Sequence, residues 1–360
     1  MKKDFQKSER FHLTRYPSNE DARPVLTPRS EIGWEKRAVF NPGIVQDGDL
    51  FRMLYRTYPD KLKEKNPRLT RPGFYFDNQI SSIGYAQSND GKKFEARKEP
   101  FIFPDTDYDR YGCEDPRITK FGDTFYITYT AIDSPISDKT KKPNIRIALA
   151  TTKDFLSVKK HGLIGPPVRS KAAALFPDLV SGGRVGLALT ISSDSTNSHV
   201  AVRYFDSIEE VLENKEGSWD FFLQTSVKTA LLTTAWWLHR GPELGAPPIK
   251  TDRGWLFLYS AESMSDTWTV SAALADMHEP HKLIAKTSGY ILQPVTEYER
   301  DGLVPNVTFP SGAMIVGDEL FVYYGAADTV IGLATCKVDA ILDALETFRE
   351  NTRDEDEYFP

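Results

Sequence analysis

The chain has 360 residues, of which 40% are hydrophobic and 12% aromatic, which is enough to bury a large core. Its formal net charge of −6, from 45 basic and 51 acidic residues, argues against a nucleic-acid-binding protein. No apolar run follows the basic N-terminus, and no segment approaches the length of a membrane helix. Two cysteines, Cys113 and Cys336, are too few for a disulfide framework, so we expect a cytoplasmic protein.

A strand–turn–strand pattern recurs five times along the chain. In four copies a proline is followed six residues later by a glycine in a turn between two apolar runs, and the fifth copy has one extra residue. The pairs are Pro42 and Gly48, Pro116 and Gly122, Pro177 and Gly183, Pro248 and Gly254, and Pro310 and Gly317. A third run of small and apolar residues follows each hairpin. Five such units predict an all-β fold, a single five-bladed β-propeller domain; the alternative is a two-sheet sandwich with chance similarity between hairpins.

Four segments lie outside this repeat. Residues 206–217 and 338–357 have helical periodicity, and the second is expected to form a short closing helix with an acidic tail over about 338–360. Residues from 1 to about 34 are expected to form an N-terminal arm. Residues 60–79 are polar and then aromatic, which is typical of a long functional loop over one face.

Two adjacent acids, Glu114 and Asp115, stand at the start of the second hairpin, directly before Pro116. The positions that the repeat predicts to be equivalent to Asp115 are Asn41, Phe176, Pro247 and Phe309. Asp115 alone is ionisable in this set, which favours a shifted pKa and a catalytic role. The alternative is that Asp115 or Glu114 pairs with an arginine such as Arg117 and fixes the turn.

Arg56 and Asp328 end equivalent second strands of the first and fifth units. We therefore expect them to converge at one end of the propeller, where Arg56 could donate to sugar hydroxyls and Asp328 could accept from them. The alternative for each is a surface ion pair. The histidines show no metal-ligand spacing, and no glycine-rich phosphate cradle is present, so we expect no metal and no cofactor.

The assembled segments resemble glycoside hydrolase family 130, the β-mannoside phosphorylases and β-mannosidases, over roughly residues 35 to 340. The segments are, in chain order, FNPGI, YRT, SSIGYAQSNDG, GCEDPRIT, YITYTA, IALATTKDF, AALFPD, GAPPI, GWLFLY, VPNVTFP and YYGAAD. The resemblance implies a five-bladed propeller and an inverting reaction on β-mannosides. It gives Asp115 the role of general acid, with its proton thought to pass through a mannose hydroxyl in family phosphorylases.

The same motifs imply a set of substrate-binding residues. The set is Asn41, Arg56, Glu114, Arg117, Asn306 and Asp328.

The chain departs from the phosphorylase pattern at several positions. Ser260 stands where family phosphorylases commonly have a histidine linked with phosphate, and Trp268 replaces a tyrosine. The strand in VGLALTIS also lacks the usual basic residues. Lys171 and Arg146 remain as possible phosphate ligands, and a phosphate site needs several convergent donors.

Glu243, in HRGPELGAPPI, stands where phosphorylases usually have small residues. A hydrolase needs a base opposite its acid, with the two carboxyl groups roughly 6.5–9.5 Å apart for inversion. Glu243 is our candidate base and Glu262 the reserve; the alternative for Glu243 is an ion pair with Arg240.

These features favour an enzyme that cleaves β-mannosides by hydrolysis, with β-1,2-linked manno-oligosaccharides as a candidate substrate. The first alternative is a phosphorylase that uses inorganic phosphate as co-substrate and releases α-mannose 1-phosphate. The second is a non-catalytic sugar-binding propeller. The expected partners are a β-mannoside oligosaccharide or glycoconjugate and, as an open possibility, further copies of the chain; neither nucleic acid nor membrane is expected.

Overall fold

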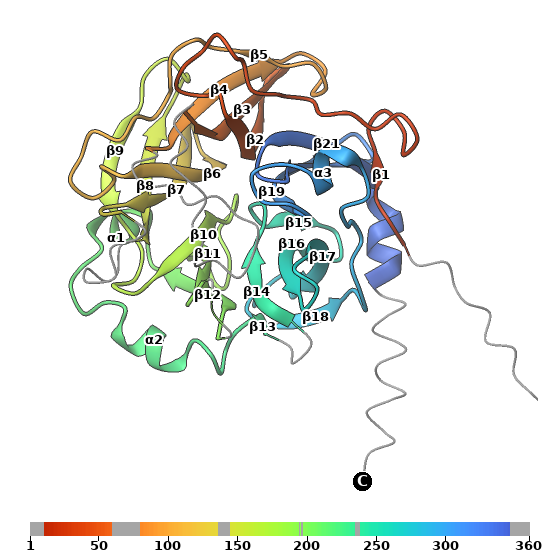
Figure 1. The fold of residues 1–360 in the computed structure, drawn as a ribbon. Helices are drawn as coiled ribbons and strands as arrows, with labels where there is room; N and C mark the ends of the chain where they lie inside the picture. Colours follow the sequence, from red (N-terminus) through yellow and green to blue (C-terminus); the bar gives the residue numbers. More distant parts are fainter. Residues whose placement is uncertain are drawn as a thin grey trace, which may run out of the picture.

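The computed structural model describes residues 11–59, 80–135, 145–193, 195, 197–234 and 238–345. Their strands form five antiparallel sheets arranged in a ring, which confirms the predicted five-bladed propeller (Figure 1). Blade 1 contains β2 (Ala38–Asp47), β3 (Leu50–Tyr58), β4 (Ser82–Ser88) and β5 (Glu95–Ala96). Blade 2 contains β6 (Gly112–Phe121), β7 (Thr124–Ile132), β8 (Ile145–Thr152) and β9 (Lys159–Leu163).

Blade 3 contains β10 (Ser170–Leu175), β11 (Val185–Ile191), β12 (His199–Phe205) and β13 (Leu232–Thr233). In blade 4, β14 (Leu238–Leu244) and β15 (Ile249–Thr251) both pair with β16 (Gly254–Ser263), which is followed by β17 (Trp268–Ala275) and β18 (Leu283–Lys286). Blade 5 contains β19 (Thr308–Val316), β20 (Glu319–Ala326), β21 (Val330–Lys337) and, from the start of the chain, β1 (Thr14–Arg15).

The N-terminal arm therefore closes the ring. Thr14 and Arg15 pair with Thr335 and Ala334 of β21, so the last blade is completed by the first described strand. Arg15 Nε then donates to the buried Glu299 Oε1 at 2.7 Å. The sequence analysis did not foresee this strand, because two residues are too short for any hydrophobic periodicity to show.

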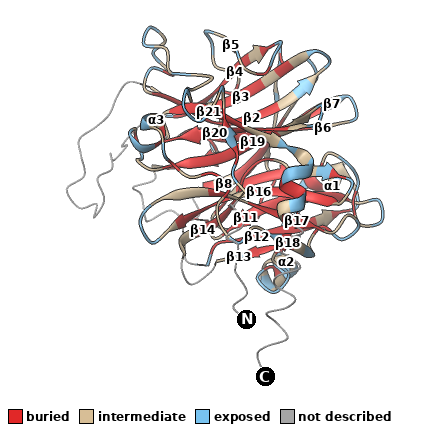
Figure 2. Ribbon diagram, turned by 90° about the vertical axis from the view of Figure 1, so that its right-hand side faces the viewer, coloured by how far each residue is buried: buried red, intermediate tan, exposed pale blue. Residues whose placement is uncertain are grey.

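The core lies between neighbouring blades, where buried apolar residues of one sheet pack on the next. Figure 2 shows buried residues along most of the strands and exposed residues mainly in the turns.

The first strands of neighbouring blades approach one another closely near the centre. A Cβ on Gly43 would lie 2.6 Å from the carbonyl oxygen of Pro116, and one on Gly312 would lie 2.6 Å from that of Pro42. This contact fixes the residues that precede Gly43 and Gly312 relative to the neighbouring blade.

Helices are few and short. Of the expected helix over 206–217, the structure forms α1 (Ile208–Glu213), whose first turn is capped by the hydroxyl of Ser207. Two further helices, α2 (Asp220–Thr225) and α3 (Glu297–Arg300), were not foreseen. The closing helix begins at 338 and is described to 345, whereas the rest of the tail and the loop 60–79 lie outside the described residues. Within the described ranges, no helix is long and apolar enough to cross a membrane.

Candidate active site

A β-bulge interrupts the first strand of every blade. The register shifts between Phe40 and Gly43, Glu114 and Arg117, Lys171 and Ala173, Arg240 and Glu243, and Phe309 and Gly312. In four blades the bulged residue has a positive φ: 47° at Asn41, 52° at Asp115, 50° at Ala172 and 95° at Gly241. Such strained backbone in a residue other than glycine is typical of functional sites. Every bulge lies in the half of its strand where the candidate site residues occur.

The bulges correct part of the predicted alignment. Asn41 and Asp115 are equivalent as expected, but their counterparts in blades 3 and 4 are Ala172 and Gly241, not Phe176 and Pro247. In blade 3, Phe176 follows the end of β10, so Pro177 belongs to the loop before β11. In blade 4, residues 245–248 separate β14 from β15, so Pro248 lies well beyond the bulge.

Asp115 is the centre of a buried polar cluster. Its Oδ1 accepts from Asn41 Nδ2 at 2.9 Å and from Arg56 Nη1 at 3.2 Å. Burial raises the pKa of Asp115, but the positive charges of Arg56, Arg117 and Lys171, with the hydrogen bond from Asn41, outweigh it and hold that pKa below its usual value. Asp115 is therefore ionised in the free protein at neutral pH.

Arg56 is held by two neighbouring aromatic rings and by its hydrogen-bond acceptors. Its guanidinium carbon lies 4.8 Å from the ring centres of both Phe40 and Tyr58, and its Nη2 donates to Glu114 Oε1 at 2.7 Å and to the Tyr58 hydroxyl. Ser81 Oγ donates to the same Glu114 oxygen at 2.8 Å. The sequence analysis missed Tyr58 and Ser81. Tyr58 had a signal, because residues two apart on a strand share a face with each other; Ser81 had none, because it stands just before β4.

Blade 5 contributes Asp328, as expected from the alignment with Arg56. Burial raises the pKa of Asp328 to about 6, opposed by the charges of Arg56 and Lys171 and reinforced by those of Asp115 and Glu114. These interactions place Asp328 in the same cluster. The roles assigned to Asn41, Arg56 and Asp328 in binding a sugar stay predictions.

Blades 3 and 4 meet in an ion pair that was not foreseen. Lys171 Nζ lies 3.2 Å from Glu243 Oε2, and the Glu243 side chain is only 1% exposed. Arg240, the alternative partner considered for Glu243, forms a two-point contact with Glu262, at 2.5 Å and 3.2 Å. Glu262 is thus engaged by an arginine, which makes it a poor reserve base, whereas Glu243 faces a lysine that also acts on Asp115 and Asp328.

For three other predicted site residues, Arg117, Arg146 and Asn306, the structure shows structural contacts or burial. Arg117 donates to the carbonyl oxygens of Asp115, Leu244 and Gly245, so its guanidinium joins blade 2 to blade 4 by backbone contacts. Arg146 lies on β8. Burial lowers its pKa, and the nearby charge of Asp133 opposes this shift only in part. The carbonyl of Asn306 accepts from the backbone N–H of Trp268 at 3.0 Å. None of these contacts tests the predicted binding roles.

Two of the departures from the phosphorylase pattern, Ser260 and Trp268, make contacts within and between blades 4 and 5. Ser260 is fully buried and its hydroxyl donates to the carbonyls of Thr269 at 2.8 Å and Thr308 at 3.2 Å, so it binds blade 4 to blade 5. Trp268 is half-buried and packs beside Phe309. Neither side chain supplies positive charge.

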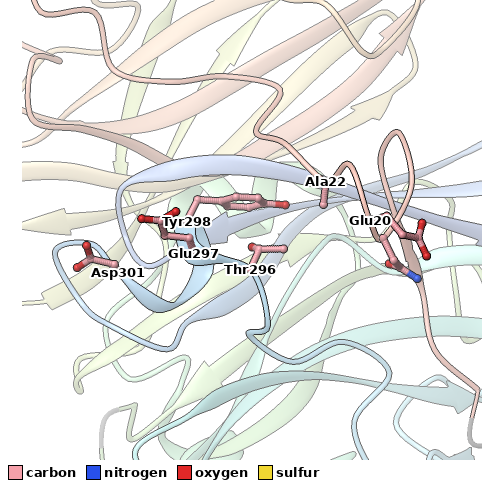
Figure 3. Close-up of a pocket in the computed structure, with 7 residues that line it drawn as sticks. Glu20, Ala22, Thr296, Glu297, Tyr298 and Asp301 are labelled. Carbon is pink, nitrogen blue, oxygen red and sulfur yellow. The ribbon is translucent and has the colours of Figure 1, made fainter.

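Other groupings lie outside the cluster. A hollow of about 590 Å³ beside α3 is lined by Glu20, Glu297 and Asp301 without any basic residue, and Figure 3 shows Glu297 and Asp301 on one side of it and Glu20 on the other. Three carboxylates there would repel a phosphate.

His239, Glu262 and Asp266 bring ligand atoms within 4.8 Å of one another, but the Arg240 guanidinium already contacts Glu262. The cluster around Asp115, to which all five blades contribute, is therefore the candidate active site.

The chain is similar to known proteins along most of its length. Residues 22–347 match a family model described as β-1,4-mannooligosaccharide phosphorylase. The chain is 31% identical over 319 residues to a 1,2-β-oligomannan phosphorylase of Thermoanaerobacter sp. (strain X514), covering 89% of this chain and 96% of the relative. It is also 31% identical over 331 residues to a β-1,2-mannobiose phosphorylase of the same organism, covering 92% and 99%.

Solved structures agree with the observed fold. A β-1,2-mannobiose phosphorylase from Listeria innocua in complex with β-1,2-mannobiose aligns with a TM-score of 0.71 at 26% identity, covering 93% of this chain and 99% of that one. A second structure, described with glycoside hydrolases that target β-1,2 mannosidic linkages in Candida mannan, aligns with a TM-score of 0.70 at 21% identity, covering 92% and 96%. The second likeness shows a shared fold.

Proposed function

Because the chain belongs to glycoside hydrolase family 130, we propose that it is an inverting β-mannoside phosphorylase acting on β-1,2-linked manno-oligosaccharides. The observation that carries the proposal is the presence of Asp115 and Lys171 in one buried cluster, which offers a proton donor and a cation for phosphate. Relatives named as β-1,2-mannoside phosphorylases, matched along nearly their whole length, support it. The balance therefore moves from hydrolysis, which the sequence favoured, to phosphorolysis.

The reaction assigns each group a step. A phosphate oxygen forms a bond to the anomeric carbon as the bond from that carbon to the glycosidic oxygen breaks, which gives α-mannose 1-phosphate. The glycosidic oxygen leaves with a proton from Asp115, directly or through a mannose hydroxyl, and the proton of the attacking hydrogen phosphate restores the acid. General acid catalysis of this kind typically contributes 10²–10⁴-fold. Lys171 offsets the charge of the attacking phosphate.

Asp115 must gain its proton in the complex, because its pKa in the free protein is low. A bound sugar displaces water from the cluster and so disfavours the ionised carboxylate. Asp328, with a pKa of about 6, is already close to its titration point near neutral pH. Asp328 is thus suited to accept a hydrogen bond from a mannose hydroxyl or to share a proton with it.

A second candidate function is hydrolysis, and the observation that favours it is Glu243. Its carboxylate repels a phosphate dianion but could activate a water molecule. Lys171 contacts Glu243 and could pair with phosphate in its place, so the same lysine is relevant to both candidate reactions.

Phosphate dependence is the test. We expect β-1,2-mannobiose to be stable in phosphate-free buffer and to give mannose 1-phosphate, in the α configuration by proton NMR, when phosphate is in excess. Release of free mannose without phosphate would replace phosphorolysis by hydrolysis. Binding of the sugar without turnover under either condition would instead indicate a silent sugar-binding propeller.

A further inference from the structure

Glu114 and Asp115 are adjacent in sequence, yet both contact the guanidinium of Arg56. In a regular strand their side chains would point to opposite faces of the sheet. The bulge between Glu114 and Arg117, with Asp115 at a φ of 52°, removes this alternation and turns both carboxylates to one side. The strained backbone therefore serves to present two acids to one arginine.

The two oxygens of Asp115 are in different surroundings. Asn41 and Arg56 both donate to Oδ1. Within the part of the chain that the structure describes, no hydrogen bond reaches Oδ2. A carboxyl group that donates a proton needs one oxygen on which to carry it. Oδ2 is the oxygen available for that proton.

The donors of Arg56 are divided between the two acids. Nη1 serves Asp115, whereas Nη2 serves Glu114, whose Oε1 also accepts from Ser81 at 2.8 Å and from the Tyr58 hydroxyl at 3.3 Å. Arginine readily forms two parallel hydrogen bonds to one carboxylate. If Arg56 formed such a two-point pair with Asp115, its second nitrogen would cover Oδ2. The hydrogen bond from Nη2 to Glu114 prevents this arrangement.

We propose that Glu114 is a positioning residue that, with Ser81 and Tyr58, holds one arm of Arg56 away from Asp115 and so keeps Oδ2 of the general acid open for its proton. This inference rests on the proposed function only in requiring a general acid. Phosphorolysis and hydrolysis need that acid equally, so the inference can fail without the choice between them failing. It also gives Glu114 a role other than the substrate contact expected from the family motif.

The charges around the pair act in the same direction. Arg56, Arg117 and Lys171 act on Asp115, and Arg56, Asp115 and Lys171 act on Glu114, with the Tyr58 hydroxyl beside it. Asp328 faces the same group of charges. Burial and the charge of Asp115 raise the pKa of Glu114 against the pull of Arg56, while the pKa of Asp115 is lowered. Where Glu114 is ionised, its negative charge opposes the ionisation of Asp115, so removing that charge would lower the pKa of Asp115 further.

The test is the pH dependence of kcat for Glu114→Gln with saturating β-1,2-mannobiose and phosphate, or without phosphate if the wild type hydrolyses. Activity is lost as pH rises through the pKa of the general acid. We expect the alkaline limb to move to lower pH by roughly one unit, which is the order of shift that a nearby charge produces. The two enzymes should converge at acidic pH, where Glu114 is protonated in the wild type.

Two further variants keep the test decisive. Ser81→Ala removes one hydroxyl, so it threatens folding less, and it should move the limb in the same direction by a smaller amount because Glu114 then takes up a proton more readily. Glu299→Gln, which removes another buried carboxylate paired with an arginine, should lower stability without moving the limb. The proposal is overturned if the alkaline limb of the kcat profile stays in place in both Glu114→Gln and Ser81→Ala. It is also overturned if KM for the sugar rises while the pH dependence of kcat is unchanged, which would make Glu114 a substrate ligand.

Discussion

Lys171 and Glu243 form an ion pair between blades 3 and 4, with 3.2 Å between Nζ and Oε2. The lysine side chain is 20% exposed and the glutamate 1%, so the cation lies on the open side of the pair. An incoming phosphate would meet Lys171 first and would have the Glu243 carboxylate behind it. The strength of phosphate binding would therefore depend on the competition between Glu243 and phosphate for Lys171.

Glu243→Gln should separate the two candidate reactions. If phosphate is the acceptor, loss of the competing carboxylate strengthens the pairing of Lys171 with phosphate, so KM for phosphate falls while kcat is largely kept. If water is the acceptor, loss of the base removes most of the activity, and azide should restore part of the rate. Initial rates against phosphate concentration measure the difference.

Lys171→Met is the matched control for that variant. It should raise KM for phosphate by about ten- to hundredfold, which corresponds to the ~1.5–3 kcal/mol of a charge-assisted hydrogen bond. A KM for phosphate that changes in neither variant would place the phosphate site elsewhere than at this pair.

Asp115→Asn should lower kcat by about 10²–10⁴-fold, because the amide cannot donate the proton that the leaving oxygen needs. The fold should be retained, since asparagine adopts a positive φ more readily than most residues and its carbonyl can still accept from Asn41 and Arg56. Circular dichroism and the midpoint of thermal unfolding provide the control. A variant with wild-type kcat would remove Asp115 from the mechanism, and one that does not fold would make its role structural.

The sequence was sufficient for the architecture because a proline-to-glycine hairpin recurs five times, four times with the same spacing and once with one extra residue. It also placed Asn41, Arg56, Asp115 and Asp328 together, since Asn41 and Asp115 occupy equivalent positions in first strands and Arg56 and Asp328 lie in or just after second strands. It failed where the blades differ: the long loop after β10 and the interruption between β14 and β15 displaced the expected equivalents of Asp115 to Phe176 and Pro247. Strand periodicity cannot show such insertions in one sequence.

Partners across blades were harder to predict than residues within a blade. Glu243 was singled out, but its contact with Lys171, 72 positions earlier in the chain, was not foreseen. The pairing register of β14 shifts between Arg240 and Glu243, and such a bulge has no reliable sequence pattern. The closing strand β1 was missed for a similar reason, because its pairing with β21 is set by the ring and not by its own residues.

Asp328→Asn should stabilise the fold at neutral pH while impairing activity. The pKa of Asp328 is raised from 3.8 to about 6, so the ionised carboxylate is less favourable in the folded protein than in the unfolded chain. The stability advantage of the wild-type carboxyl is complete below the unfolded value and is lost as pH rises through about 6. Urea unfolding on either side of that pH should show that the free energy of unfolding of the variant increases relative to that of the wild type as pH rises. If the difference between the two free energies does not change with pH, burial does not raise the pKa of Asp328.

The closure of the ring supplies the last prediction. Arg15 of β1 and Glu299 of α3 are both buried, and Glu299 also accepts from the Tyr324 hydroxyl at 2.7 Å and from the backbone N–H groups of Val295 at 2.8 Å and Thr296 at 3.0 Å. Arg15→Met leaves this carboxylate buried without its cation, which typically costs about 3–5 kcal/mol. We expect a correspondingly lower free energy of unfolding in urea at neutral pH.

The pH dependence of this loss has a definite sign. Burial raises the pKa of Glu299, but the hydrogen bond from Arg15 and those from Thr296 and Val295 outweigh it, so the pKa is lowered and the stabilisation is present at neutral pH and lost as pH falls through that lowered value. Without Arg15 the carboxyl protonates at higher pH, so the deficit of Arg15→Met should shrink under acid conditions. Lys337→Met, which removes the exposed partner of Asp318 at 2.8 Å, is the control and should have little effect. Equal losses in the two variants would mean that β1 is held by its strand pairing with β21 and not by the buried arginine.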